Sequence, residues 1–316
     1  MDNLRAAFPG EARRGVSHQY TSRLFAFEHT PQTPLTPPQN LVIFVGGLFD
    51  GLHTVPYTSI VADALPPTWT IAQAIISSSY TGWGTCSLQK DVKELSRCVA
   101  YFRKIKSGKI VLMGHSTGCQ DVLEYLTGEG RESRAPIDGG IIQAAVSDRE
   151  ALGISHDAET LAESCVVAQR MVDDGDEDEM MSSTDIDGAF PCPVSAKRWL
   201  SLVSPNHDGD DDMFSSDLTD KQLMKTFGSL PASTPLCILL SGDDEFFSSN
   251  LGMDQKAILE RWVGIVERGE GVVDVENSGV VEGATHNLLH NPEEVVEGLV
   301  RRVVGFLSGL LPQANL

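Results

Sequence analysis

Apolar residues recur along this chain with two different periods, and segments of the two kinds alternate. Short β-branched or aromatic runs closed by glycine, proline or aspartate predict strands. These strands are expected at residues 22–29, 41–45, 69–77, 110–113, 140–146, 235–240 and 271–276. Apolar residues three and four positions apart predict helices at 57–65, 87–106, 118–126 and after Pro292. Because alternating strands and helices favour parallel pairing through right-handed crossovers, we expect an α/β fold: a mostly parallel central sheet with helices on both faces.

Residues 148–234 interrupt this alternation. They separate two predicted core strands by far more chain than a crossover needs, so we expect an insertion with its own structure. Helices are predicted at 157–172, 194–203 and 218–227, beside two acidic runs, DDGDEDE and HDGDDD. Like charges resist compaction, so both runs are expected to be solvated and mobile. The sequence therefore predicts a largely helical acidic cap at 148–234 over the carboxyl edge of the sheet, between core segments 1–147 and 235–316.

The net charge of −20 restricts the kinds of partner. Residues 148–220 hold 19 acidic side chains against four basic ones, so most of the excess charge lies in the expected cap. Such a surface repels nucleic acid and anionic membranes and attracts cationic ligands. We therefore expect a small-molecule partner, with no nucleic acid and no membrane; the sequence does not specify an oligomeric state.

Other composition features predict a cytoplasmic protein without a cofactor. No apolar run approaches a transmembrane length, and the N-terminus lacks the apolar region of a signal peptide. The six cysteines lie far apart without metal-binding spacing, which favours reduced, buried thiols. The sequence contains neither the GxGxxG pattern nor the Walker sequence of nucleotide-binding proteins. The run Asp208-x-Asp210-x-Asp212 begins like a calcium loop, but Met213 replaces the required glycine.

The stretch Gly114-His115-Ser116-Thr117-Gly118 lies between a predicted strand and a predicted helix. A strand that turns into a helix this sharply strains the serine backbone, and side chains at the two flanking glycines would clash with neighbouring elements. The serine hydroxyl is then presented at the sheet edge, beside the helix N-terminus. This context favours Ser116 as a nucleophile over an ordinary glycine-rich turn.

A serine nucleophile needs a base, and the base needs a group that orients it. Asp243 and Asp244 both follow the strand 235–240, and we favour Asp244 because it lies further past the strand end. His286 follows a Gly-Ala turn before the last helix, whereas His290 lies next to the helix-opening Asn-Pro, so we favour His286.

Acyl transfer also needs two N–H donors for the oxyanion. The residue after the nucleophile, Thr117, supplies one. The paired glycines Gly46-Gly47 let the backbone approach a substrate, so Leu48 is the candidate for the second. Trp83 lies in a loop at the carboxyl edge of the sheet, where it is either a substrate-binding residue or a packed turn residue.

The order of Ser116, Asp244 and His286 resembles that of the α/β-hydrolase superfamily, over residues 20–147 and 235–310. Many members have His-Gly before the oxyanion donor, where this chain has Gly46-Gly47. More narrowly, VGGLFDGLHTVPY, SSYTGWGTCSL, MGHSTGCQDV and SPNHDGDDDMFSSDL resemble a mainly fungal hydrolase family that includes intracellular esterases of the siderophore fusarinine C.

The resemblance implies a serine esterase with no cofactor that cleaves a siderophore ester, with iron as part of the ligand. Free amines on such a siderophore would suit the acidic cap. Two alternatives remain open. One is a thioesterase, lactonase or acyltransferase on the same triad, and the other is a non-catalytic binding protein with this fold.

Overall fold

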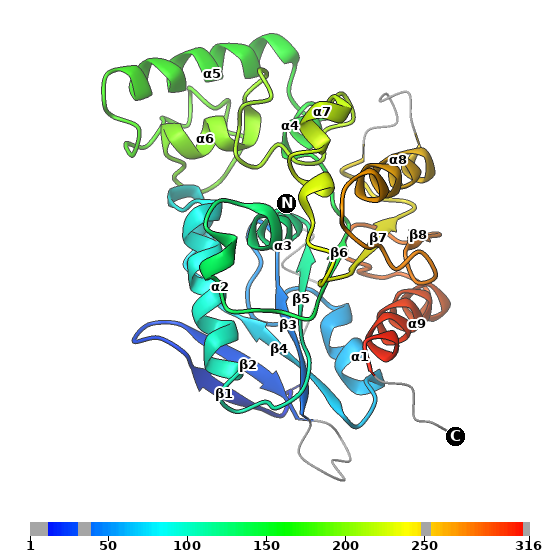
Figure 1. The fold of residues 1–316 in the computed structure, drawn as a ribbon. Helices are drawn as coiled ribbons and strands as arrows, with labels where there is room; N and C mark the ends of the chain where they lie inside the picture. The colour runs from blue at the N-terminus through cyan, green and yellow to red at the C-terminus, as the bar shows by residue number, and fades with distance from the viewer. Residues whose placement is uncertain (1–11, 31–38, 248–253, 312–316) are drawn as a thin grey trace.

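The computed structural model describes residues 12–30, 39–247 and 254–311, which build a sheet of eight strands (Figure 1). Its order is β1-β2-β4-β3-β5-β6-β7-β8. The strands are β1 (Gly15–Gln19), β2 (Phe25–His29), β3 (Asn40–Val45), β4 (Trp69–Ala74), β5 (Ile110–His115), β6 (Gly139–Gln143), β7 (Leu236–Ser241) and β8 (Gly279–Val281). Strands β1 and β2 pair antiparallel, as do β2 and β4, and all other pairs are parallel. This confirms the predicted mostly parallel α/β sheet.

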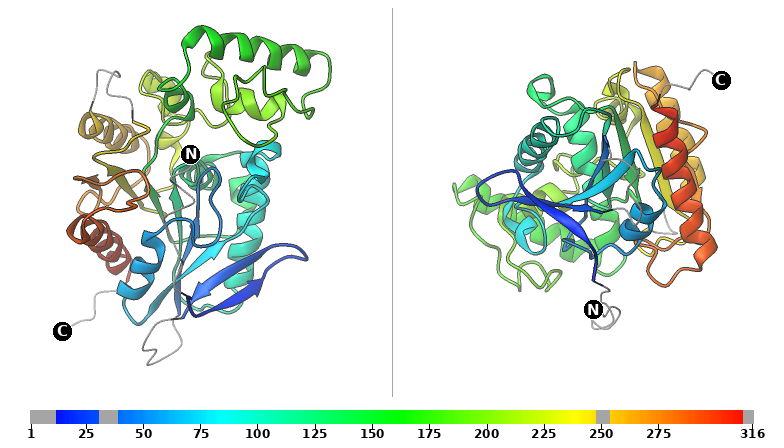
Figure 2. Two further views of the ribbon diagram at one scale, coloured as in Figure 1. Left: turned by 180° about the vertical axis from the view of Figure 1, so that it is seen from behind. Right: turned by 90° about the horizontal axis from the view of Figure 1, so that it is seen from below.

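Helices cover both faces of the sheet (Figures 1 and 2). Helices α2 (Leu88–Phe102), α3 (Gly118–Thr127) and α8 (Gln255–Arg268) pack on one face, and α1 (Tyr57–Ala64) and α9 (Glu293–Gly309) on the other. Strand β3 shows the reason for its continuous apolar run. Leu41, Ile43 and Val45 join the core under α2 and α3, whereas Val42 and Phe44 join the core under α1 and α9. A strand buried on both faces needs apolar side chains at every position.

The segment expected to be a cap contains α4 (Asp148–Leu152), α5 (Ala158–Asp173), α6 (Ala196–Val203), α7 (Asp220–Leu223) and the short 3-10 helix η4 (Phe227–Ser229). Helices α5 and α6 pack together beyond the end of the sheet at which β5 terminates (Figure 1). Trp199 of α6 is fully buried there, and its indole N–H donates to Ser164 Oγ at 2.9 Å. The same apolar cluster includes Trp83, with Leu48 packed against it, so α5 and α6 pack on the loops after β3 and β4.

The expected strand at 271–276 is wrong. Val273 forms only an isolated bridge to Leu236, and the last strand is β8. The cause is Asp274, whose Oδ1 accepts from the backbone N–H groups of Glu276 and Asn277 at 3.1 Å each. An aspartate that binds its own downstream amides makes a turn rather than a strand.

The helix expected at 218–227 is also shorter than predicted, because this stretch holds only α7, followed by η4. The Thr219 side chain begins α7 with a capping box to Gln222, but the helix ends after one turn. Strands β1 and β8 and helices α4 and α8 lie where the apolar pattern produced no prediction.

The two acidic runs differ from each other. Residues 173–179 are mostly exposed, as expected. In 207–212, Asp208 and Asp210 are exposed, but the expectation is wrong for Asp211. It is only 1% exposed, and its Oδ2 accepts from Arg198 and from the Ser201 hydroxyl at 2.5 Å each. A buried carboxylate is tolerated when a cation and further donors satisfy it. Charge counting along the sequence does not reveal such partners.

The six cysteines, all within the described residues, are buried free thiols. No helix in the described ranges combines the length and apolar character needed to cross a membrane.

Candidate active site

Ser116 lies in the turn between β5 and α3, with a φ of 55°. Its backbone N–H donates to Gln143 O at 3.0 Å, which ties the turn to the end of β6. A Cβ at Gly114 would lie 2.1 Å from Gly118 O, and one at Gly118 would lie 2.4 Å from Val45 O. Both positions therefore require glycine, for the reason that the sequence predicted. The turn holds the serine in a strained conformation at the carboxyl edge of the sheet.

Asp244 and His286 are brought together from the ends of β7 and β8. The two Asp244 carboxylate oxygens lie 3.0 and 2.9 Å from His286 Nδ1, and the two residues are 8% and 6% exposed. The backbone N–H of Phe246 also donates to Asp244 Oδ1, at 3.0 Å. In contrast, Asp243 and His290 are exposed. Of the two aspartates and two histidines considered, Asp244 and His286 form the contact.

Further groups hold the His286 imidazole. The backbone N–H of His286 donates to Glu245 Oε2 at 2.8 Å. The Phe246 ring meets the imidazole edge-on, with centroids 4.7 Å apart, and the His115 ring lies 4.9 Å away on a tilted plane. Burial, and then the neighbouring His286, lower the pKa of His115 to about 4. His115 is therefore neutral at pH 7 and adds no positive charge beside His286.

Gln143 links these elements, and sequence reasoning missed it. Its Oε1 accepts from Tyr57 OH at 2.8 Å and from His115 Nδ1 at 2.6 Å. Its Nε2 donates to Ser241 Oγ at 3.0 Å and to His286 O at 3.4 Å. The signal in the sequence was a single polar residue inside the apolar run GGIIQAAV. In the structure this residue is fully buried. Buried polar side chains that bind several partners specify one arrangement of a core.

The loop after β3 lies directly against the serine. A Cβ at Gly47 would come within 2.5 Å of Ser116 Cβ and 3.0 Å of Ser116 Oγ. Asp50, a second residue that was missed, holds the loop: its Oδ2 accepts from Gly47 N–H at 2.9 Å. Neither Leu48 N–H nor Thr117 N–H has a hydrogen-bond acceptor within the described part of the chain. Two free donors thus lie on the two segments that flank Ser116.

Comparison with known proteins shows the family to which the chain belongs. Residues 4–308 match the model of a family described as a protein of unknown function, DUF1749. The chain belongs to this family. It is 37% identical to the fusarinine C esterase sidJ of Aspergillus fumigatus, over 94% of this chain and 96% of that protein. It is 36% identical to the esterase AN6793 of Emericella nidulans, over 96% and 95% of the two chains.

Solved structures show the fold of the family. The siderophore hydrolase EstB from Aspergillus fumigatus superposes with a TM-score of 0.82 at 35% identity, covering 97% of this chain and 100% of that one. A monoglyceride lipase from Saccharomyces cerevisiae gives a TM-score of 0.61 at 11% identity, over 96% and 98% of the two chains. The chain has the α/β-hydrolase fold.

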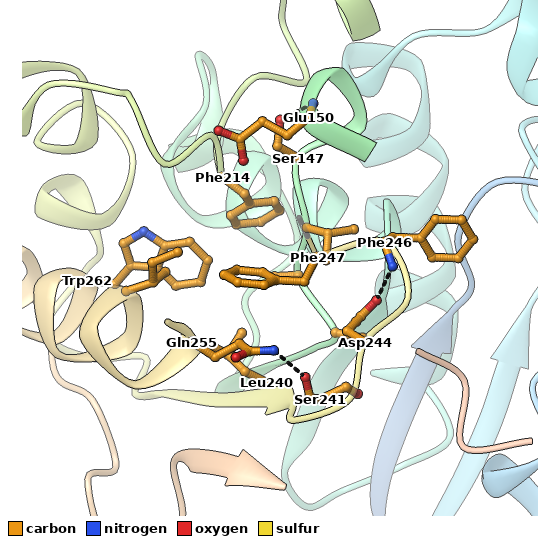
Figure 3. Close-up of a pocket in the computed structure, with 14 residues that line it drawn as sticks. Ser147, Glu150, Phe214, Leu240, Ser241, Asp244, Phe246, Phe247, Gln255 and Trp262 are labelled. Carbon is orange, nitrogen blue, oxygen red and sulfur yellow. Dashed lines mark hydrogen bonds between the residues drawn. The ribbon is translucent and has the colours of Figure 1, made fainter. Parts of the chain in front are cut away.

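In this family member, one pocket is lined by Asp244 and another by Thr117, the residue after Ser116. The first lies between β7, α8 and the cap segment (Figure 3). Phe214, Phe247 and Trp262 gather on one side of it, and Asp244 lies on another (Figure 3). Most of its lining residues are apolar.

The second pocket lies next to the serine turn. Gly47, Leu48 and Thr117 line it, and so does Trp83, which is 1% exposed and packs edge-on against Phe190 at 4.7 Å. Trp83 is thus both a packed turn residue and a pocket wall. Polar side chains from α2, α3 and α6 complete the lining.

The described residues contain no group of histidine, cysteine and acidic side chains arranged to hold a metal ion. The calcium-like run is engaged within the protein: Gln89 Nε2 donates to Asp210 at 3.0 Å, and His207 contacts Asp212 at 2.8 Å.

Proposed function

We propose that this protein is a serine esterase with Ser116, His286 and Asp244 as its catalytic triad. The observation that carries the proposal is the contact of 2.9 Å between Asp244 and His286 Nδ1, at the edge of the sheet where Ser116 occupies a strained turn. Named esterases among the relatives support the same reaction class.

The Asp244 contact determines which imidazole nitrogen acts as the base. A carboxylate that accepts from Nδ1–H keeps the proton there, so the Nε2 lone pair is free. In the proposed reaction, Nε2 takes the Ser116 proton as Oγ attacks the ester carbonyl. The imidazolium then protonates the leaving alcohol, and water releases the acyl group by the same two steps.

The N–H groups of Leu48 and Thr117 are proposed to bind the oxyanion. They have no acceptor within the described residues, and the Gly47 backbone is close to Ser116. Donors that are already positioned before charge develops stabilise the tetrahedral intermediate without reorganisation.

We further propose that residues 148–234 act as a cap that shapes the substrate site. Phe214 lines the first pocket and Arg198 the second, so this segment supplies walls to both. In α/β hydrolases the reaction depends on the triad, whereas the surrounding walls select the substrate.

The proposed substrate is a siderophore ester of the fusarinine C type, in which iron belongs to the substrate. The support comes from relatives. The fusarinine C esterase is 37% identical over nearly the whole chain, and the siderophore hydrolase has the same fold, with a TM-score of 0.82. Trp83 is the proposed aromatic contact, because it lines the pocket beside the oxyanion donors.

Replacing the nucleophile tests the reaction class. Ser116→Ala should lower kcat on a simple aryl ester by roughly 10³-fold or more and abolish labelling by a fluorophosphonate probe. Ser308→Ala, on the exposed face of α9, is the matched control and should be labelled like the wild type. Labelling of Ser116→Ala at the wild-type rate would show that Ser116 is not the nucleophile.

Product analysis tests the substrate. Mass spectrometry of incubations with ferric fusarinine C, its triacetylated relative and an aryl ester should show ring opening of a siderophore at an added mass of one water per cleaved ester. If the aryl ester is cleaved and neither siderophore is, the triad proposal stands and the substrate proposal fails.

A further inference from the structure

The second pocket is acidic at its base. Asp91 of α2 and Asp121 of α3 both line it, and they are only 3% and 5% exposed. The same pocket includes Leu48 and Thr117, the proposed oxyanion donors. Two carboxyl groups therefore lie in a recess that continues from the reacting centre.

Asp121 lacks the partners that a buried carboxyl normally has. Its Oδ1 is inaccessible to solvent, and its carboxyl makes no hydrogen bond within the described residues. Asp91 receives one hydroxyl, from Ser78, at 2.6 Å to each oxygen. A buried polar group without a partner costs free energy, so a ligand that satisfies it gains affinity.

The positive charge of Arg198, which lines this pocket, is already paired within the protein. Of the residues lining it, Arg198 carries the positive charge, and its guanidinium pairs with Asp211 at 2.5 Å. Burial, and then the Asp91 charge, raise the pKa of Asp121 well above its usual range, and burial raises the pKa of Asp91 to about 7. The carboxyl groups therefore exceed the positive charge available to them, and a bound cation would allow both to ionise.

We propose that Asp91 and Asp121 form a subsite for a primary ammonium group carried by the ester substrate. This inference rests on the proposed esterase function and specifies the class of ester, an amine-bearing one. An ammonium offers three donors and a positive charge, which match the unpartnered Asp121 and the lightly bonded Asp91. The Trp83 ring in the same wall suits a cation as well.

The test compares ethyl ω-aminoalkanoates of increasing length with their N-acetylated counterparts and with unsubstituted alkanoates. Wild-type protein should prefer the amino ester at one chain length. Asp121→Asn should lower the ratio of kcat/KM for amino ester to alkanoate by roughly 10- to 100-fold, the value of a charged hydrogen bond. The ratio isolates the subsite from any general effect on turnover.

Asp148→Asn is the matched control. Asp148 is half-buried and belongs to the same group of charged residues, but it accepts from Gln120 Nε2 at 2.8 Å and does not line the pocket. Its substitution should leave the ratio at the wild-type value. A second measurement needs no variant: alkylammonium ions should compete with the ester on wild-type protein, and alcohols of equal length should not.

The outcomes are distinct. A preference for the N-acetylated ester would overturn the inference, because it would mean that a protonated carboxyl donates to a carbonyl. Ser116-dependent cleavage without an amine preference, and without competition by alkylammonium, overturns the subsite alone. If no ester is cleaved, the proposed function fails and the subsite with it.

Discussion

Asp243 and Asp244 are neighbours in the chain but lie in opposite surroundings. Asp243 is exposed, and its backbone N–H donates to Ala284 O at 2.8 Å. The Asp244 side chain is 2% exposed and contacts both His286 Nδ1 and Phe246 N–H. A carboxylate with two such donors orients the imidazole and stabilises its charged form.

Asp244→Asn should lower kcat on an ester substrate by roughly 10³- to 10⁴-fold, because an amide no longer holds the proton on Nδ1. Steady-state kinetics, with thermal unfolding to check the fold, measures this. Asp243→Asn removes a charge one residue away and should leave kcat within about twofold. The reverse order of effects would assign the catalytic acid to Asp243.

At the scale of elements, three backbone segments lie in close contact at the serine turn. The end of β3, the turn after β5 and the start of α3 approach so closely that Gly47, Gly114 and Gly118 have no room for a Cβ. This close approach is what brings the β3 loop to the serine. The two glycines around Ser116 were predictable from the strand–turn–helix motif, whereas the contact of Gly47 with Ser116 was not, because it joins segments about 70 residues apart in an order that only the sheet establishes.

Gly47→Ala tests this contact. The new Cβ would lie 2.5 Å from Ser116 Cβ, so either the loop or the serine must move. We expect kcat to fall by roughly 10²-fold, as a misplacement of about 1 Å in a catalytic group does. Stability should fall by about 1–3 kcal/mol, as for other overpacked sites.

Gly309→Ala provides the comparison in α9, where a Cβ would meet no atom within 4 Å. It should preserve kcat and raise the unfolding temperature slightly, because alanine favours a helix over glycine. Normal kcat for Gly47→Ala would mean that the β3 loop does not position the catalytic groups.

At the scale of the whole molecule, a buried charged cluster joins the core to the cap segment. Asp91 and Asp121 come from the core, and Arg198 and Asp211 from the cap segment. Asp148, at the start of α4, is half-buried beside them, and its pKa rises to about 8 because of desolvation and then the nearby Asp211. Folding therefore brings together more carboxyl groups than Arg198 neutralises.

The pH dependence of stability follows from the sign of that shift. With a folded pKa of about 8 and an ordinary value of 3.8, the folded protein retains a proton that the unfolded chain loses in this range. The stability contributed by Asp148 is therefore fully present below about pH 4 and is lost as the pH rises through about 8. Asp148→Asn lacks this titration.

The unfolding free energy of Asp148→Asn, measured with urea, should increase relative to the wild type as the pH is raised from 4 to 8. Asp157→Asn, at an exposed helix cap, serves for comparison. A difference between wild type and Asp148→Asn that stays constant with pH would show that Asp148 titrates normally.

Local patterns in the chain were enough to predict the alternation of strands and helices, the glycine-bounded serine turn, and the chain order of serine, acid and histidine. Each depends on a few adjacent residues, so its physical cause is visible in the chain. Where a local polar contact overrides the apolar pattern, as Asp274 does at the expected strand 271–276, the prediction was wrong.

Which charges are buried, and what they contact, depends on packing between elements that are distant in the chain. Both 173–179 and 207–212 are acidic runs, yet Asp211 of the second run is buried against Arg198. The same applies to Gln143 under His286, and to Asp91 and Asp121 in one pocket. These contacts join residues from different elements, and their free energy depends on burial and distance, which packing of the sheet, helices and cap segment alone establishes.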